Sequence, residues 1–84
     1  MDEIKKLREQ INAIDKQISE LLSTRFSVVT KIGEQKKAQG ILVCDQTREQ
    51  EVVNAVCANL SGKQREYVQE IYREIIKNSR KIQE

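Results

Sequence analysis

Histidine, proline and tryptophan are absent from the 84 residues, which contain three glycines and two cysteines. Without histidine the chain lacks the commonest general base and metal ligand, so neither a catalytic triad nor a metal centre is expected. The two cysteines, Cys44 and Cys57, form no CxxC pair and follow no secretory leader. This arrangement favours reduced thiols and a cytoplasmic location.

The chain also lacks long apolar runs and a large net charge. No stretch approaches the roughly 18 apolar residues needed to span a bilayer, so no membrane partner is expected. Its 15 basic and 13 acidic residues give a net charge of +2, which argues against a nucleic-acid partner. A single domain over residues 1–84 buries little of its surface, so oligomerisation is the expected source of further stability.

The composition indicates a helical protein, because no proline interrupts the chain and a third of its residues are charged. Apolar side chains recur at alternating steps of three and four, as at positions a and d of a heptad. They are Ile4, Leu7, Ile11, Ile14, Ile18, Leu21, Val28 and Ile32. The spacing predicts one helix over about residues 3–38, which would be roughly 54 Å long and exceed the diameter of a compact domain of this size.

Two shorter helices are predicted after the first one. Gly40 is a typical C-terminal cap, and Asp45 a typical N-cap for a second helix. The sequence SGKQ at 61–64 matches a capping box that would open a third helix. The predicted fold class is therefore all-α, with three helices per chain.

Each predicted helix carries polar residues on the side that its apolar residues assign to the core. These residues are Arg25, Lys36, Arg48, Glu49, Ser79 and Gln83. Taken singly, each has a structural explanation: a polar heptad residue can fix register, and a lysine near a helix C-terminus favours the helix dipole. Taken together, three cations, one carboxylate and two neutral donors point inward with no other partner in the sequence. Because unpaired buried charges cost several kcal/mol each, a polyanionic ligand is expected.

Four segments carry a resemblance to a known family: LREQINAIDKQISELLSTR, IGEQK, DQTREQEVV and IIKNSRKIQ. In this order they resemble the all-helical class of chorismate mutases over essentially the whole chain. The family pattern comprises two arginines of the first helix, Gly-x-x-Lys, Asp-x-x-Arg-Glu and Ser-x-x-x-Gln. Its polar positions are held here by Arg8, Arg25, Lys36, Asp45, Arg48, Glu49, Ser79 and Gln83.

The resemblance implies an intertwined homodimer with two equivalent sites, in which chorismate rearranges to prephenate during phenylalanine and tyrosine biosynthesis. No cofactor is implied, because the rearrangement is unimolecular and requires no nucleophile or metal. Arg8 and Arg25 would bind the substrate carboxylates with help from Ser79, and Lys36 and Gln83 would face the ether oxygen. Arg8 lies 17 residues before Arg25, about 26 Å along a helix, so it would enter the site of the partner subunit.

The remaining residues of the pattern would complete this site. Glu49 and the backbone of Asp45 would bind the ring hydroxyl, and Arg48 would organise the surrounding side chains. The sequence departs from the pattern at Asn12, where many relatives have aspartate, and in a connection, ILVCD, that lacks a proline. Gln83 lies on a terminal turn that is expected to fray unless packing or ligand holds it.

Two other functions stay open on the sequence alone. Isochorismate pyruvate lyases share the fold and a similar cationic site. A helical dimer without catalytic activity, serving as a regulatory or docking module, is the other alternative. Relatives also occur as one domain of larger fused pathway enzymes, so the chain is compatible with an origin in such a fusion.

Overall fold

The structure is a computed structural model that describes residues 2–84. It contains three helices, α1 (Asp2–Gln39), α2 (Gln46–Val56) and α3 (Gly62–Gln83), and no strand within the described residues. The predicted all-α class and the long first helix are therefore confirmed, and α1 extends one residue further at each end than expected.

The end of α1 is set by Gly40, as predicted. This residue has a φ of 70°, a left-handed conformation that glycine adopts without steric cost. The Gly40 N–H donates to the carbonyl of Lys37 at 3.3 Å, and the Ile41 N–H donates to that of Lys36 at 2.8 Å. These two bonds form a Schellman motif, which satisfies carbonyls that the end of the helix would otherwise leave unpaired.

The two predicted N-caps have different outcomes. The Asp45 carboxylate accepts a hydrogen bond from the Arg48 N–H at 3.0 Å, so this cap is confirmed. Ser61 occupies the N-cap of α3, but its side chain makes no capping hydrogen bond, and the capping box is therefore wrong. Gly62 follows with a φ of 59°, which turns the backbone sharply at this point. The Arg65 guanidinium instead ties the two helices together, because it donates to the carbonyl of Cys57 at 2.8 Å.

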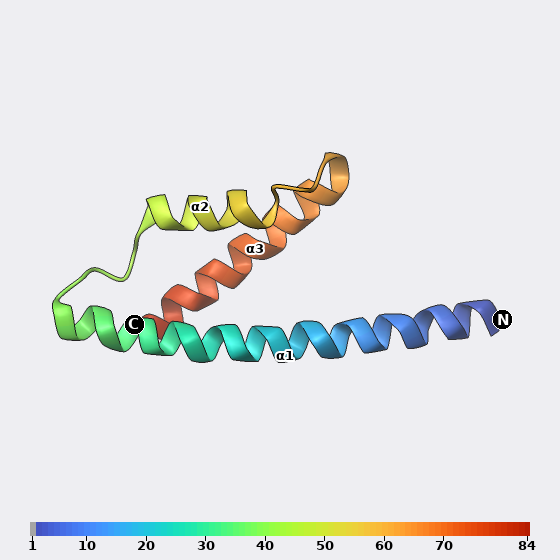
Figure 1. Cartoon of the computed structure of the whole chain (residues 1–84), viewed down its shortest axis with the longest axis horizontal. Coiled ribbons are helices and arrows are strands. Elements are labelled where there is room, and N and C mark those ends of the chain that lie inside the picture. Colours follow the sequence, from blue (N-terminus) through green and yellow to red (C-terminus); the bar gives the residue numbers. More distant parts are fainter. Residues whose placement is uncertain (1) are drawn as a thin grey trace.

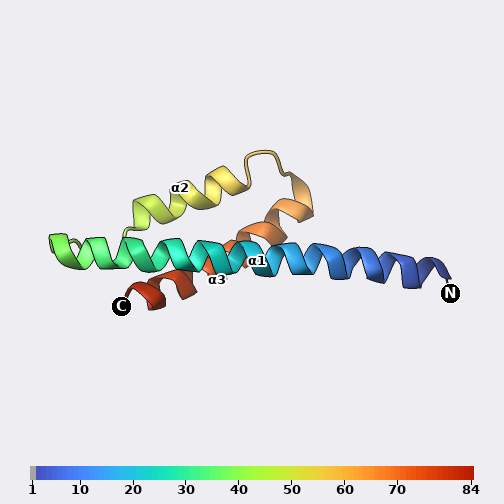
Figure 2. The same ribbon diagram turned by 60° about the horizontal axis from the view of Figure 1, so that its bottom comes forward.

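α3 crosses the space between the other two helices and packs against both of them (Figure 1). Within the described residues the backbones of α1 and α2 do not approach each other, and the second view agrees (Figure 2). The N-terminal part of α1 extends past both other helices. The molecule measures 57 × 26 × 16 Å with a radius of gyration of 16.2 Å, whereas a compact domain of this length would have about 12 Å.

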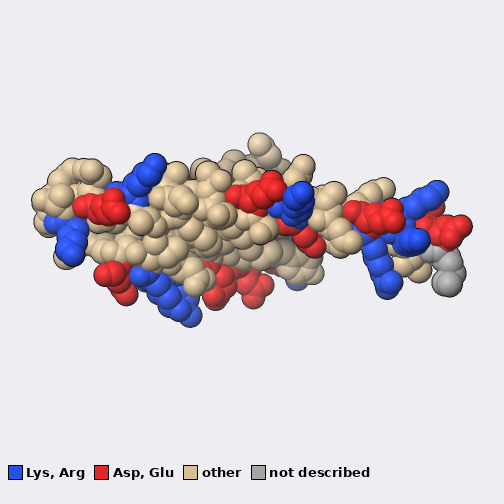
Figure 3. All heavy atoms as spheres, turned by 90° about the horizontal axis from the view of Figure 1, so that it is seen from below, with Lys and Arg blue, Asp and Glu red and all other residues tan. Residues whose placement is uncertain are grey.

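The buried apolar core of the described residues is small. It consists of Val29, Val53, Cys57 and Ile76. All residues of the range 2–21 are exposed, although this range carries six of the eight heptad residues. Seen from below, the central part of the molecule shows mostly uncharged residues, with charged residues at its margins and at its N-terminal end (Figure 3). None of the described helices combines the length and the apolar character that crossing a membrane requires.

Candidate active site

A cavity of about 230 Å³ lies where α1, α3, the first two turns of α2 and the connection between α1 and α2 meet. Seven of the eight residues predicted for the site line this cavity. They are Arg25, Lys36, Asp45, Arg48, Glu49, Ser79 and Gln83. Apolar walls come from the same helices and the connection, through Val29, Ile32, Val43, Val52 and Ile76.

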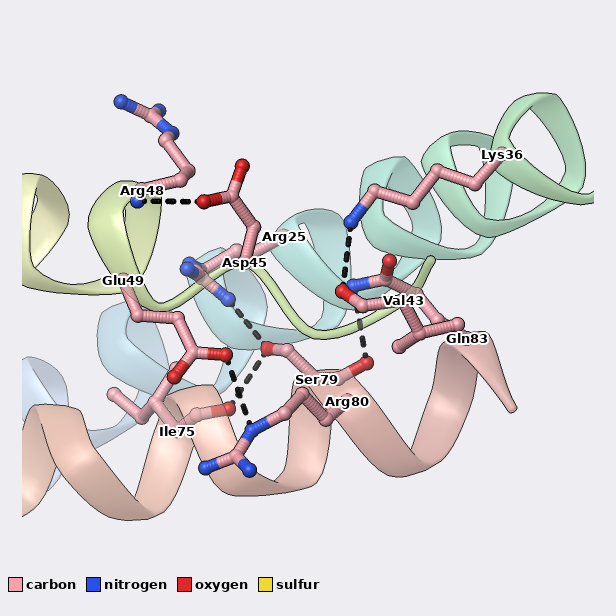
Figure 4. A network of polar contacts seen from close by, with 10 residues as sticks. All are labelled: Arg25, Lys36, Val43, Asp45, Arg48, Glu49, Ile75, Ser79, Arg80 and Gln83. Carbon is pink, nitrogen blue, oxygen red and sulfur yellow. Dashed lines mark hydrogen bonds and ion pairs between the residues drawn. The ribbon is translucent and has the colours of Figure 1, made fainter. Parts of the chain in front are cut away.

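Arg25 is held in place by two neighbours on α3. Its Nη1 donates to Ser79 Oγ at 2.6 Å, and the guanidinium carbon lies 5.8 Å from the centre of the Tyr72 ring, a cation–π distance. Ser79 is 5% exposed, and its hydroxyl donates onward to the carbonyl of Ile75 at 2.7 Å (Figure 4). A guanidinium has five N–H donors, so this arrangement orients Arg25 and still leaves donors for a planar carboxylate.

Lys36 and Gln83 are directed at the same end of the cavity (Figure 4). The Lys36 ammonium donates to the carbonyl of Val43 at 3.0 Å, and this carbonyl belongs to the connection between α1 and α2. Gln83 Nε2 donates over 3.4 Å to the carbonyl of Ser79 in its own helix, while its Oε1 is buried without a hydrogen-bond partner. The Lys36 ammonium and the neutral Gln83 amide thus border the same small space. The amide makes only one long hydrogen bond there.

Glu49 has an unpredicted partner in Arg80. Arg80 Nε lies 3.1 Å from Glu49 Oε2, and both residues line the cavity. The Nε–H is not aligned for a hydrogen bond, so the contact is an ion pair by distance. The expectation that the inward charges have no partner within the chain is therefore wrong for Glu49. A signal was present, because Arg80 follows Ile76 by four residues and so continues the buried side of α3.

Asp45 and Arg48 contribute differently from the residues above. The Asp45 carboxylate is used as the N-cap of α2, which fixes the backbone at this edge of the cavity. The Arg48 side chain is 68% exposed, lies 3.6 Å from Glu51 and points away from the other labelled side chains (Figure 4). Arg48 therefore lies at the rim of the cavity.

Arg8 is the one predicted site residue that does not line the cavity. It lies on the exposed N-terminal part of α1, 17 residues before Arg25 in a continuous helix. At 1.5 Å per residue the two residues are about 26 Å apart along the axis. Their side chains each reach about 6 to 7 Å, so they cannot bind one small molecule from the same helix.

The donor set of the cavity suits an anion that is bound by direct contact. Arg25 and Lys36 supply positive charge, and Ser79 and Gln83 supply neutral polar groups beside them. Within residues 2–84 no three side chains of the types that bind metal ions gather in one place. The arrangement can therefore orient an anionic molecule and stabilise negative charge that develops on it.

Comparison with known proteins identifies the family to which the sequence is similar. The family model described as chorismate mutase type II matches residues 7–84, a range that contains all eight predicted site residues. Comparison with individual curated proteins gives no match.

Proposed function

Since the chain belongs to the chorismate mutase type II family, a family of isomerases, we propose that it converts chorismate to prephenate for phenylalanine and tyrosine synthesis. The observation that carries this proposal is the convergence of Arg25, Lys36 and Gln83 on one cavity of about 230 Å³. This volume lies below the roughly 300–1,000 Å³ of sites for drug-sized ligands, which limits the ligand to a small molecule.

The residues of the cavity match the demands of the reaction. In this rearrangement one C–O ether bond breaks while one C–C bond forms within the same molecule, and no proton has to be transferred. Catalysis then requires a compact conformer of a flexible dianion and donors at the ether oxygen, where negative charge develops. A site without histidine can supply both, because neither task needs a general base.

Arg25 would hold one substrate carboxylate, and Ser79 would help by turning its O–H from the Ile75 carbonyl to the substrate. Their 2.6 Å hydrogen bond places the two groups side by side, and the planar guanidinium matches the geometry of a carboxylate. Lys36 and Gln83 would face the ether oxygen. The compact ammonium of Lys36 would provide most of the electrostatic stabilisation, and the Gln83 amide would leave its weak 3.4 Å bond to donate to the same oxygen.

The ring hydroxyl of the substrate would be bound at the edge of the cavity formed by α2. Glu49 is 24% exposed and can accept a hydrogen bond there, while Arg80 at 3.1 Å keeps its carboxylate in place. The backbone of Asp45 would be the second partner, because its position is fixed by the N-cap. Arg48, at the rim, would organise these groups at a greater distance from the reacting atoms.

We further propose that the enzyme is a homodimer with intertwined long helices. The eight heptad residues of α1 are between 44% and 69% exposed in the single chain, and they form a stripe that only Arg25 interrupts. Burying the exposed half of these side chains would stabilise the assembly by on the order of 10 kcal/mol per chain. This gain from both chains exceeds the estimated 4–15 kcal/mol cost of association.

The proposed dimer also accounts for Arg8. If α1 of each chain runs along its partner, the Arg8 side chain of one subunit reaches the cavity of the other and supplies the second carboxylate clamp. Each site would then contain residues of both chains, and a monomer would have no complete site. A single domain over residues 1–84 and a cytoplasmic location remain predictions from the sequence.

An assay of the purified chain tests the proposed reaction directly. Loss of chorismate absorbance, with a product of unchanged mass, is the expected result, and Arg25→Ala should lose most of this activity. Isochorismate serves as the second substrate, because a lyase would release pyruvate from it. A folded dimer that consumes neither compound would contradict the proposal and favour a regulatory or docking module.

A further inference from the structure

Gly33 is buried in α1 at the point where the last turn of α3 lies against it. A Cβ atom built on Gly33 would lie 3.0 Å from Gln83 Cα, 3.1 Å from its Cγ and 3.2 Å from its Cβ. Nine in ten real Cβ contacts in proteins are longer than this. The absence of a side chain at Gly33 therefore permits the observed approach of Gln83 to α1.

The backbone of Gly33 does not itself require glycine. The glycines with positive φ among the described residues are Gly40 and Gly62, whereas Gly33 lies within the regular part of α1. Alanine is the better helix former at such a position, so helix propensity alone predicts that Gly33→Ala would stabilise the protein. The close contact with Gln83 opposes this substitution.

Gly33 also lies one helical turn before Lys36, on the same part of α1 that borders the cavity. We infer that Gly33 is a positioning residue, whose missing side chain lets the Gln83 amide reach the end of the cavity where the Lys36 ammonium lies. The catalytic part of this inference rests on the proposed function. Gly33 itself touches no reacting atom, and it acts through the distance between α1 and α3.

A side chain at position 33 would displace Gln83 more readily than it would unfold the protein. Gln83 is the last residue of α3, and its side-chain bond to Ser79 is long at 3.4 Å. α1 is continuous on both sides of Gly33 and has its own backbone hydrogen bonds. A shift of the last turn of α3 would therefore relieve the overlap. This shift would move the Gln83 amide away from its place in the cavity.

The test compares Gly33→Ala with Gly62→Ala as a matched control. An added Cβ at Gly62 meets nothing within 4 Å, but its φ of 59° makes alanine strained there. We expect Gly33→Ala to reduce kcat by about tenfold with a much smaller change in KM, because Gln83 has to move by a few tenths of an ångström and a shift of about 1 Å of a catalytic group can cost 100-fold. Gly62→Ala should lower Tm and leave kcat within threefold of wild type.

A double-mutant cycle separates positioning from a general effect on structure. If Gly33→Ala acts through the Gln83 amide, then adding it to Gln83→Ala should change kcat by less than threefold. Equal losses in both backgrounds would overturn the inference, and so would a Gly33→Ala enzyme with kcat within threefold of wild type. A Gly33→Ala protein that fails to fold would overturn it as well, because the shift would then not be confined to the last turn of α3.

An NMR measurement keeps this inference separate from the proposed function. The side-chain NH₂ resonances of Gln83 should move in Gly33→Ala and stay in place in Gly62→Ala. If wild type does not consume chorismate, the proposed function fails, yet these resonances still decide whether Gly33 positions Gln83. Unchanged Gln83 resonances in Gly33→Ala would overturn the positioning role in either case.

Discussion

The two halves of α1 have the same heptad pattern but different surroundings. Residues 2–21 are all exposed, whereas residues 22–39 pack against α3 and include the buried Val29 and Gly33. The second half also carries Arg25 and Lys36, which line the cavity. In the second half α3 covers the face that carries Val29 and Gly33, whereas the heptad residues stay about half exposed along the whole helix.

The first half is tested by the largest change, the double substitution Ile11→Glu/Ile14→Glu. Both side chains belong to the stripe and are about half exposed in the single chain. Four carboxylates in a dimer seam would cost several kcal/mol, so we expect a monomer without measurable activity and with reduced helicity. Sedimentation and circular dichroism measure the two effects.

The control for this experiment adds the same charge outside the stripe. Asn12→Glu/Ala13→Glu changes two exposed neighbours on the other side of the same turn. It should remain a dimer with full activity. A dimeric and active Ile11→Glu/Ile14→Glu protein would show that the first half of α1 does not form the interface.

The second half is tested by Lys36→Ala. Loss of one preorganised neutral donor costs about 10²- to 10³-fold in rate, and loss of a full charge should cost more, so kcat should fall by several orders of magnitude. The adjacent Lys37, which is exposed, provides the control Lys37→Ala with nearly unchanged kcat. Circular dichroism should show an intact fold in both variants. Activity of Lys36→Ala within tenfold of wild type would exclude the proposed role.

A mixing experiment tests whether Arg8 of the first half and Arg25 of the second half act in one site across two chains. Arg8→Ala and Arg25→Ala should each be nearly inactive, because every site in either homodimer lacks one clamp. After joint unfolding and refolding in equal amounts, half of the dimers are mixed and each has one intact site. About a quarter of wild-type activity should return. No recovery, with mixed dimers detected by native mass spectrometry, would mean that Arg8 does not act in the partner's site.

The smallest effect is expected from Gln83→Glu, and it depends on pH. The wild-type amide does not titrate, so the rate should be nearly flat from about pH 5 to 8. A carboxyl group donates a hydrogen bond only when protonated, and an unperturbed Glu has a pKa of about 4.3. The variant should therefore be most active in acid and lose activity as pH rises. Gln64→Glu, in the exposed first turn of α3, should keep the flat profile, and the same flat profile in Gln83→Glu would exclude a donor role for Gln83.

The helix boundaries were predictable because local rules determine them. Gly40 and Asp45 end one helix and begin the next through their own backbone conformation and side-chain chemistry, as expected. The Ser61 cap was not predictable from its residue type, because the hydroxyl has to point at a particular N–H and here it does not. The sequence shows that a hydroxyl is present at position 61. Whether it reaches an N–H of the first turn of α3 depends on the backbone turn at Gly62.

The site was only partly predictable for a similar reason. Periodicity and the family pattern identified the seven side chains that the structure gathers round one cavity. They did not identify the Val43 carbonyl that accepts from Lys36, because every residue has a carbonyl and only the fold selects one. Arg80 was not among the predicted residues, although it pairs with Glu49, because the family pattern does not include it. The role of Arg8 stays a prediction, because the single chain holds it on the exposed part of α1, away from the cavity.

The continuity of α1 over 38 residues limits how its exposed first half can change in length. In the proposed dimer, the stretch between Arg8 and Arg25 spans the distance from one site to the other. Adding one residue there would rotate Arg8 by 100° and advance it by 1.5 Å, and adding a full heptad would restore the face but move it by about 10.5 Å. This shift exceeds the reach of an arginine side chain. Exposed positions of this segment can therefore accept many substitutions. Insertions and deletions in it should abolish activity, because they move Arg8 away from the partner's site.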